Sequence, residues 1–265
     1  MIDWQERTKQ LLGTEQAARL AAAHVLVVGV GGVGAYAAEL ICRAGVGEMT
    51  LVDADTIQPS NINRQLPATH DTVGHLKVEV MAERMRAINP LLRLHLHPQY
   101  LTEADVPTLL DEMQEGSATP FIVDAIDTIA PKCALIAEAV RRGIPIVCSM
   151  GAGAKSDITK VQFAPLADTF HCGLSKAVRT RLRQMGKESG QAAFAARLMR
   201  VPVVFSIEQA DRNAIITVQG EQNKKSTTGT ISYMPAVFGC YLAEHAIRHL
   251  TQTGLKADKP ATRPQ

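Results

Sequence analysis

The feature that most constrains this chain is a glycine-rich turn near its N-terminus. An apolar segment leads into the motif GVGGVG, which spans residues 29–34. At such a turn Gly29 permits a sharp change of chain direction, and Gly31 and Gly32 let backbone N–H groups approach a phosphate. Gly34 lets the following helix pack closely, and the N-terminus of that helix adds a partial positive charge. The motif therefore predicts a strand, a turn and a helix that together bind a phosphate.

The first 150 residues alternate between strand-like and helix-like segments. Short apolar runs predict strands over residues 25–28, 49–52, 92–96, 121–124 and 144–148. Longer periodic segments predict helices over residues 33–44, 77–88, 106–113 and 132–142. This alternation predicts an α/β fold with a doubly wound, mostly parallel, Rossmann-like sheet, whose ligands lie at the carboxyl ends of the strands.

The character of the chain changes after residue 149. A mixed C-terminal extension is predicted, with short strands over residues 161–163, 203–205 and 215–218, a basic helical stretch, and a last apolar helix over 237–250. We expect a single domain over 1–252, made of an N-terminal helix (1–22), a nucleotide-binding core (25–150) and a substrate-binding half (151–252). Residues 253–265 contain almost no apolar side chain and are predicted to be disordered.

Composition narrows the class of protein. Apolar residues make up 46% of the chain and charged residues 20%, an ordinary globular balance. The net charge is only +2, so a nucleic-acid surface would require local clustering of cations. The first residues lack the basic-then-apolar pattern expected of a secretory signal, and the longest apolar run is shorter than the roughly 20 residues of a membrane span. We therefore expect a soluble, cytoplasmic protein.

The five cysteines are far apart and form no Cys-x-x-Cys pair. In an intracellular chain this pattern predicts buried thiols rather than disulfides or a zinc site. Cys240 lies within the last apolar segment and is expected in the core.

Acidic side chains follow the second predicted strand. Asp53 lies about 20 residues beyond the glycine motif, where a carboxylate accepts hydrogen bonds from ribose hydroxyls. Asp55 shares that role, assists a metal ion or caps the strand end; the sequence leaves these alternatives open. A nicotinamide dinucleotide would be satisfied by the glycine turn and Asp53 alone.

A polar loop and a lysine then argue for a triphosphate. Asn61, Arg64 and Gln65 lie in the loop, and Lys77 opens the next helix. A guanidinium at the β- and γ-phosphates would stabilise a pyrophosphate leaving group, which hydride transfer does not produce. Lys77 opposes the helix dipole, so a phosphate partner would explain its position. The alternative for both cations is an ordinary solvated side chain.

Asp127 follows the strand at residues 121–124. Magnesium usually takes one or two protein carboxylates and completes its octahedron with phosphate oxygens and waters. The alternative is a simple helix cap. Beside the glycine turn, Arg64 and Lys77, this carboxylate predicts ATP and Mg²⁺ as cofactors, with attack at the α-phosphate.

These motifs carry a resemblance to a known superfamily. GVGGVG, LVDADTIQPSNINRQ, GHLKVEVMAERMRAINP and VDAIDT resemble the ubiquitin-activating and sulfur-carrier-activating adenylating enzymes over roughly residues 25 to 150. The resemblance implies an acyl adenylate intermediate and Asp127 as the metal ligand. For the nucleotide it implies phosphate binding by Gly31, Gly32, Gly34, Arg64 and Lys77, ribose binding by Asp53, and a positioning role for Gln65. The residue patterns add Gly29, Asp55 and Asn61 to the expected nucleotide-binding set.

The resemblance also implies a homodimer. Relatives complete each ATP site with an arginine from the N-terminal helix of the partner, and Arg7 is the best match here, with Lys9 as the alternative. An apolar last helix that needs cover points the same way. The implied catalytic set is Arg64, Lys77, Asp127 and Arg7.

The second half of the chain indicates which branch of this superfamily the sequence resembles. The paired Cys-x-x-Cys motifs of sulfur-carrier-activating enzymes are absent. VFSIE (residues 204–208), GTISYMP (229–235) and a basic stretch instead resemble the tRNA-modifying branch, which dehydrates N6-threonylcarbamoyladenosine by adenylating its threonyl carboxylate. The basic stretch is expected to bind tRNA; a solvated helix face is the alternative. Its cations are Lys176, Arg179, Arg181, Arg183, Lys187, Arg197 and Arg200.

Two further functions stay open. One is adenylation of the C-terminal glycine of a ubiquitin-like sulfur carrier, and the other is an NAD-dependent oxidoreductase. The resemblance also implies a cysteine desulfurase or sulfur-acceptor partner, which some relatives have.

Overall fold

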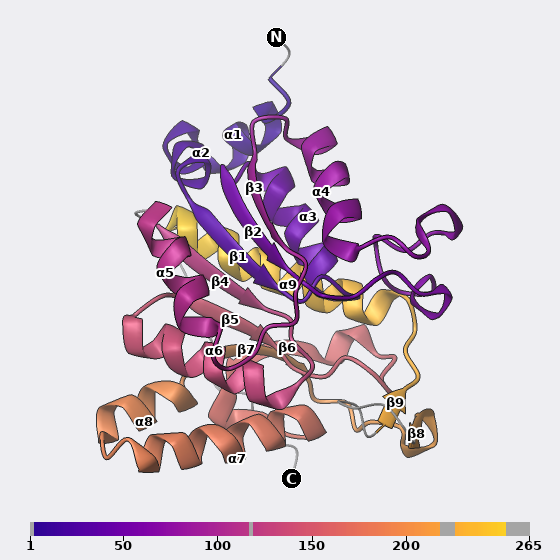
Figure 1. Cartoon of the computed structure of the whole chain (residues 1–265), viewed down its shortest axis with the longest axis vertical. Coiled ribbons are helices and arrows are strands. Elements are labelled where there is room, and N and C mark those ends of the chain that lie inside the picture. Colours follow the sequence, from indigo (N-terminus) through magenta and orange to yellow (C-terminus); the bar gives the residue numbers. More distant parts are fainter. Residues whose placement is uncertain (1–2, 117–118, 218–225, 253–265) are drawn as a thin grey trace.

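The computed structural model describes residues 3–116, 119–217 and 226–252. These residues form a seven-stranded sheet with helices packed on it (Figure 1). The strand order is β3-β2-β1-β4-β5-β7-β6, and only β6 runs antiparallel to its neighbour. The strands are β1 (His24–Val28), β2 (Glu48–Val52), β3 (Arg93–His97), β4 (Pro120–Asp124), β5 (Ile146–Ser149), β6 (Val161–Pro165) and β7 (Pro202–Ser206). This confirms the predicted fold class.

Helices cover both faces of the sheet (Figure 1). Side chains alternate along a strand, so Val25 and Val27 of β1 enter one apolar core while Leu26 and Val28 enter the other. The first core includes residues of α2 (Thr14–Ala21), α3 (Gly34–Ala44), α4 (Lys77–Ile88) and α9 (Tyr233–Thr251). The second includes residues of α5 (Val106–Gly116), α6 (Ile129–Arg142), α7 (Gly173–Glu188) and α8 (Ala192–Met199).

The N-terminal segment forms two helices where one was predicted. The first, α1 (Glu6–Leu12), and the second, α2, meet at Gly13, whose φ of +92° breaks the helical path. A two-stranded hairpin of β8 (Ile215–Thr217) and β9 (Ser226–Thr228) precedes α9. The end of the strand predicted at 215–218 and the tail predicted to be disordered lie outside the described residues.

The last helix is covered by its own chain. α9 packs against α3 so closely that a Cβ at Gly239 would lie 2.6 Å from Val33 O. Phe238 and Leu242 are fully buried in the first core. The argument that this helix needs a partner for cover was therefore wrong.

Three of the five cysteines are buried, and all five are free thiols. Cys172 is half-buried and Cys240 is exposed. The prediction of Cys240 as a core residue was wrong, because the core face of α9 carries Phe238, Gly239 and Leu242 instead.

A buried ion pair joins β4 to α6. Lys132 Nζ lies 2.7 Å from Asp124 Oδ2, and both side chains are fully buried. Lys132 Nζ also donates to Ile126 O at 3.0 Å, and Asp124 Oδ1 accepts from Ile126 N at 3.0 Å. These bonds hold the turn between β4 and α6 in one shape.

Replacing Lys132 with methionine should destabilise the fold by roughly 3–5 kcal/mol, because Asp124 would remain as an uncompensated buried charge. Urea unfolding measures this change. The double variant Lys132→Met/Asp124→Asn should recover much of the loss, since neither buried group is then charged. A single variant as stable as wild type would contradict the interpretation.

A second polar cluster lies at the amino ends of the central strands. Glu48 accepts hydrogen bonds from Arg93 Nη2 at 2.6 Å and shares another with His95 Nε2 at 2.8 Å. Beside it, His24 Nε2 is bonded to Thr50 Oγ1 at 2.8 Å. Burial lowers the pKa of His24, although the charge of Glu48 acts in the opposite direction.

Stability should therefore fall as the pH drops through about 6.5, because the unfolded chain then binds a proton at His24 that the folded chain does not. Between pH 7.5 and 5.5, His24→Gln should reduce the loss of unfolding free energy by on the order of 1 kcal/mol. Denaturant titrations at the two pH values measure the difference. Substitution of the exposed His70 is the control for the removal of a histidine as such.

Candidate active site

The turn between β1 and α3 tolerates only glycine at two points. Gly29 has φ of +88°, and a Cβ there would lie 2.8 Å from Ala125 O. A Cβ at Gly34 would overlap Gly29 O. The N-terminus of α3 therefore sits directly against the end of β1, and its backbone N–H groups are available at the carboxyl edge of the sheet.

Asp53 holds this turn to the neighbouring strand. Its carboxylate accepts hydrogen bonds from Val30 N at 2.7 Å and from Asp55 N at 2.9 Å. Each oxygen keeps a further acceptor position. Asp53 can therefore fix the turn and still accept a hydroxyl.

Lys77 is buried rather than solvated. Only 4% of the residue is exposed, and its Nζ lies 2.6 Å from Asp55 Oδ2. The alternative of a solvent-facing lysine is thus excluded. The sequence left three roles open for Asp55: ribose binding, metal binding and capping of the strand end. The structure shows a fourth role, because Asp55 is the counter-ion of Lys77.

Arg64 and Gln65 lie beneath the glycine turn. In the loop after η1 (Pro59–Asn61), Arg64 Nη1 donates to Ser60 O and to Asn63 Oδ1, both at 2.9 Å. The Gln65 side chain is buried, and its Oε1 lacks a hydrogen-bond partner within the described structure. A Cβ at Gly31 would lie 3.7 Å from Gln65 Nε2, so this amide faces the turn. A buried acceptor without a partner at this point fits a polar ligand bound beside the turn.

The remaining two motif residues lie at the same edge. Asn61 accepts a hydrogen bond from Gln58 N at 3.0 Å and so orders its own loop. Asp127 is exposed directly after β4, two residues beyond Ala125, whose carbonyl contacts Gly29. In the described residues, no three His, Cys, Asp or Glu side chains are grouped to hold a metal. A single carboxylate beside a phosphate turn does suit magnesium, which takes most of its ligands from phosphate and water.

Arg7 is not part of this site within one chain. It is exposed on α1, next to Gln5, whose side chain packs on Gly45 after the C-terminal end of α3. That point lies at the opposite edge of the sheet from the glycine turn. The assignment of Arg7 to the site of a partner copy stays a prediction.

The cations of the basic stretch do not form one continuous surface. Lys176, Arg183 and Lys187 are exposed on α7 at spacings of seven and four residues, which place them on one face. Arg179 turns inward to the hydroxyls of Thr169 and Ser175, and Arg181 is half-buried.

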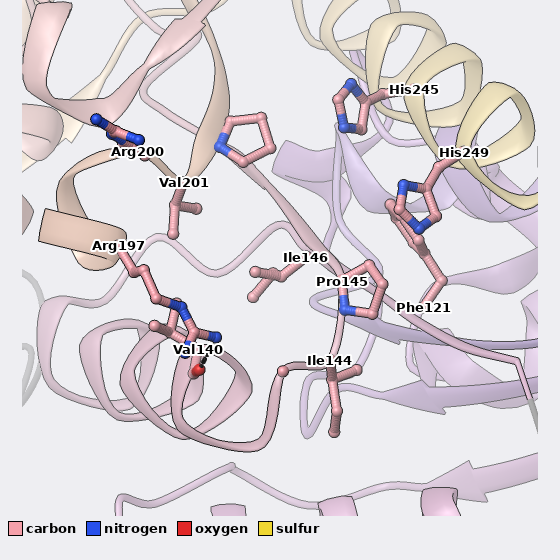
Figure 2. A pocket seen from close by; sticks show the side chains of 12 residues that line it. Phe121, Val140, Ile144, Pro145, Ile146, Arg197, Arg200, Val201, His245 and His249 are labelled. Atoms are coloured by element: carbon pink, nitrogen blue, oxygen red, sulfur yellow. Dashed lines mark hydrogen bonds between the residues drawn. The ribbon is translucent and has the colours of Figure 1, made fainter. Parts of the chain in front are cut away.

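The other two cations line a separate pocket of about 360 Å³ (Figure 2). Arg197 and Arg200 lie on one side of it and His245 and His249 on the other, above an apolar floor, and Arg197 donates to Val140 O. Because Ile146 and Pro202 begin their strands there, the pocket lies at the edge opposite the glycine turn. Arg197 and Arg200 thus do not continue the exposed face of α7.

Two parts of the site were missed by the sequence reasoning. The first is the Asp124–Lys132 pair, which positions the turn that carries Asp127. The sequence held a signal for this pair, because each of the two charged residues lies within an apolar run. The second is residues 229–235, the segment before α9 together with its first turn, which the sequence offered only as a family motif. Asn63 Nδ2 donates to Thr230 O at 2.9 Å, and a Cβ at Gly32 would lie 3.1 Å from Pro235 Cβ.

The chain is similar to known proteins along nearly its whole length. The ThiF family matches residues 5–264. The chain is 35% identical to the tRNA threonylcarbamoyladenosine dehydratase of Escherichia coli K12, over 93% of this chain and 94% of that protein. The corresponding enzyme of Bacillus subtilis is 34% identical, over 94% and 95%. A yeast adenylyltransferase and sulfurtransferase from Lodderomyces elongisporus is 29% identical over only 58% of this chain and 32% of that protein.

Solved structures agree. Crystal structures of the E. coli dehydratase in complex with ATP and with AMP match with TM-scores of 0.80 and 0.79. Each covers 95% of this chain and 96% of the other, at 33% and 34% identity. The part of the chain that the structure describes has no helix with the length and apolar character of a membrane span.

The family match over residues 5–264 and the identity to both dehydratases show that the chain belongs to the ThiF family, and within it to the group of the tRNA threonylcarbamoyladenosine dehydratases.

Proposed function

We propose that this protein is an ATP-dependent dehydratase that cyclises N6-threonylcarbamoyladenosine in tRNA. The observation that carries the proposal is similarity to such enzymes along nearly the whole chain, which includes the substrate-binding half as well as the nucleotide turn. The gathering of the glycine turn, Asp53, Lys77 and Gln65 at one edge of the sheet supports ATP as the cosubstrate.

The chemistry follows from the substrate. A carboxylate oxygen of the threonyl group attacks the α-phosphate of ATP and releases pyrophosphate. The carbamoyl oxygen then attacks the activated carbonyl, AMP leaves with one carboxylate oxygen, and the carbamoyl nitrogen loses its proton. The net change is loss of water. No protein nucleophile is needed, because the attacking oxygen is already held in the same molecule at high effective concentration.

The residues of the site fit this reaction. Backbone N–H groups at Gly31 and Gly32 would bind phosphate, and Lys77 would exchange Asp55 for a phosphate oxygen. Arg64 would bind the departing pyrophosphate once its present bonds to Ser60 and Asn63 are released. Asp127 would hold a magnesium ion, which when bound neutralises charge on the phosphates.

The assembly is part of the proposal. We infer a homodimer in which Arg7 of one copy completes the ATP site of the other. The face formed by Lys176, Arg183 and Lys187 would contact the tRNA backbone. A tRNA substrate also implies a cytoplasmic location. The family resemblance further implies a sulfur-relay partner.

Activation of a ubiquitin-like sulfur carrier is the second candidate, favoured by the partial similarity to adenylyltransferase–sulfurtransferases. One experiment separates the two. The protein is incubated with Mg²⁺-ATP and tRNA that contains threonylcarbamoyladenosine, and nucleosides are analysed by mass spectrometry. A product lighter by one water supports the proposal. An unchanged nucleoside, with an adenylate trapped only on a carrier protein, contradicts it.

Arg64→Ala should lower turnover by about 10²–10³-fold while AMP binding is nearly unchanged, because the guanidinium acts on the leaving pyrophosphate. Single-turnover kinetics and titration with AMP make the comparison. Equal losses in both would mean that Arg64 only shapes the loop. Arg86→Ala, at an exposed position on α4, is the matched control.

Asp127→Asn should raise the magnesium concentration needed for half-maximal activity and lower turnover strongly, with the fold intact. Activity is measured across a magnesium titration, and the melting temperature checks the fold. If both the titration and the turnover match wild type, Asp127 is a helix cap.

Charge reversal at Lys176, Arg183 and Lys187 should weaken tRNA binding and reduce its salt dependence. Each lost phosphate contact should lower the slope of log K against log salt by about 0.7–0.9. ATP binding should be unchanged. Reversal of Arg19, Arg86 and Arg248, three cations on other surfaces, is the control. Wild-type salt dependence in the α7 variant would assign that face to solvent.

A further inference from the structure

The segment before α9 lies beside the phosphate turn. Thr230, in this segment, accepts the hydrogen bond from Asn63, and Pro235, in the first turn of α9, contacts Gly32, so this part of the chain meets both loops of the nucleotide site. On the other side, a Cβ at Gly153 would lie 2.7 Å from Thr228 Cγ2. The start of α9 thus stands at the boundary between the nucleotide-binding core and the C-terminal half (Figure 1).

Tyr233, the first residue of α9, presents an aromatic ring at this boundary. The residue is 45% exposed, and its hydroxyl donates to Ser156 O at 3.0 Å. The ring is therefore anchored at both ends, by the helix and by the hydroxyl, while much of its surface faces solvent. Ile231, two residues earlier, is exposed to a similar extent. Apolar surface fixed in place beside a catalytic site favours a ligand with a flat apolar face.

The proposed reaction brings nucleobases, which have flat apolar faces, to the surroundings of Tyr233. The threonyl carboxylate must reach the α-phosphate, so the nucleoside that carries it must approach the glycine turn together with its neighbours in the chain. Proteins that bind unpaired RNA stack aromatic side chains on the bases. Arg212 is exposed on η5 (Arg212–Ala214), which is joined to the same segment by the Gly229 N to Ala214 O bond at 2.7 Å. An exposed cation on a segment bonded to the one that precedes Tyr233 suits a ribose–phosphate backbone.

We propose that Tyr233 stacks on an unpaired base of the tRNA substrate and so positions the reactive nucleotide over the glycine turn. This rests on the proposed function. Tyr233 is a positioning residue, because it holds the substrate without contact with the reacting atoms. Two other roles are distinguishable: a tether in which only the hydroxyl matters, and a contact between two copies of the chain.

The test uses the full-length protein and two variants. Tyr233→Phe keeps the ring and loses the bond to Ser156, whereas Tyr233→Ala loses both. In steady-state modification of tRNA, the alanine variant should raise KM for tRNA about tenfold or more, as expected for one lost base stack. The phenylalanine variant should stay within about twofold of wild type. Leu91→Ala, an 88% exposed apolar position at the other edge of the sheet, is the control.

A direct measurement uses a tRNA substrate that carries 2-aminopurine next to the reactive adenosine. Wild type and the phenylalanine variant should quench its fluorescence, and the alanine variant should not. Affinity for a fluorescent ATP analogue should be equal in all three proteins. Thermal melting confirms that each variant is folded.

Three results would overturn the inference. If phenylalanine and alanine raise KM equally, the hydroxyl tether is the function of Tyr233. If sedimentation shows that the alanine variant alone dissociates, the ring lies between copies. If neither variant changes KM or quenching, the ring has no role in binding RNA. Failure of wild type to modify tRNA contradicts the proposed function instead, and the quenching measurement still reports on stacking.

Discussion

The close approach of backbone to backbone at the β1–α3 turn is the constraint on which the site depends. With no side chain at Gly34, the helix begins against the carbonyl of Gly29, and its free N–H groups reach the edge of the sheet. The other parts of the site are then attached to this turn: Asp53 through Val30 N, and Gln65 through its packing on Gly31. A shift of α3 by the width of one methyl group would displace all of them together.

The fold, and the placement of the candidate residues at one edge of the sheet, could be predicted because both depend on local patterns. Apolar runs of four or five residues define buried parallel strands, and the carboxyl ends of such strands meet at one edge. The orientation of individual side chains could not. Lys77 is buried and Arg179 turns inward because α4 and α7 pack on particular neighbours, and periodicity within one helix does not say which neighbour offers a carboxylate or a hydroxyl.

The errors at the C-terminal end have a common physical origin. An apolar helix needs cover, but the sequence does not tell whether the cover comes from the same chain or from another copy. Gly239 settles this for α9, because it lets α3 approach within van der Waals contact. The same packing assigns Phe238 and Leu242 to the interior and leaves Cys240 at the surface. Hydrophobicity alone predicted a buried cysteine there, and the helix geometry reversed it.

The pairing of Lys77 with Asp55 has a consequence for electrostatics. In the proposed ATP site the lysine already has an internal counter-anion, so Lys77 is not an isolated buried cation before a nucleotide binds. An arriving polyphosphate replaces one negative partner with another, and Asp55, two-thirds exposed at its side chain, returns to water. Lys77 would thus lose one anionic partner as it gains another, and this exchange cancels part of its attraction for the nucleotide. The affinity for nucleotide should therefore depend on ionic strength as if the site held fewer cations than it does.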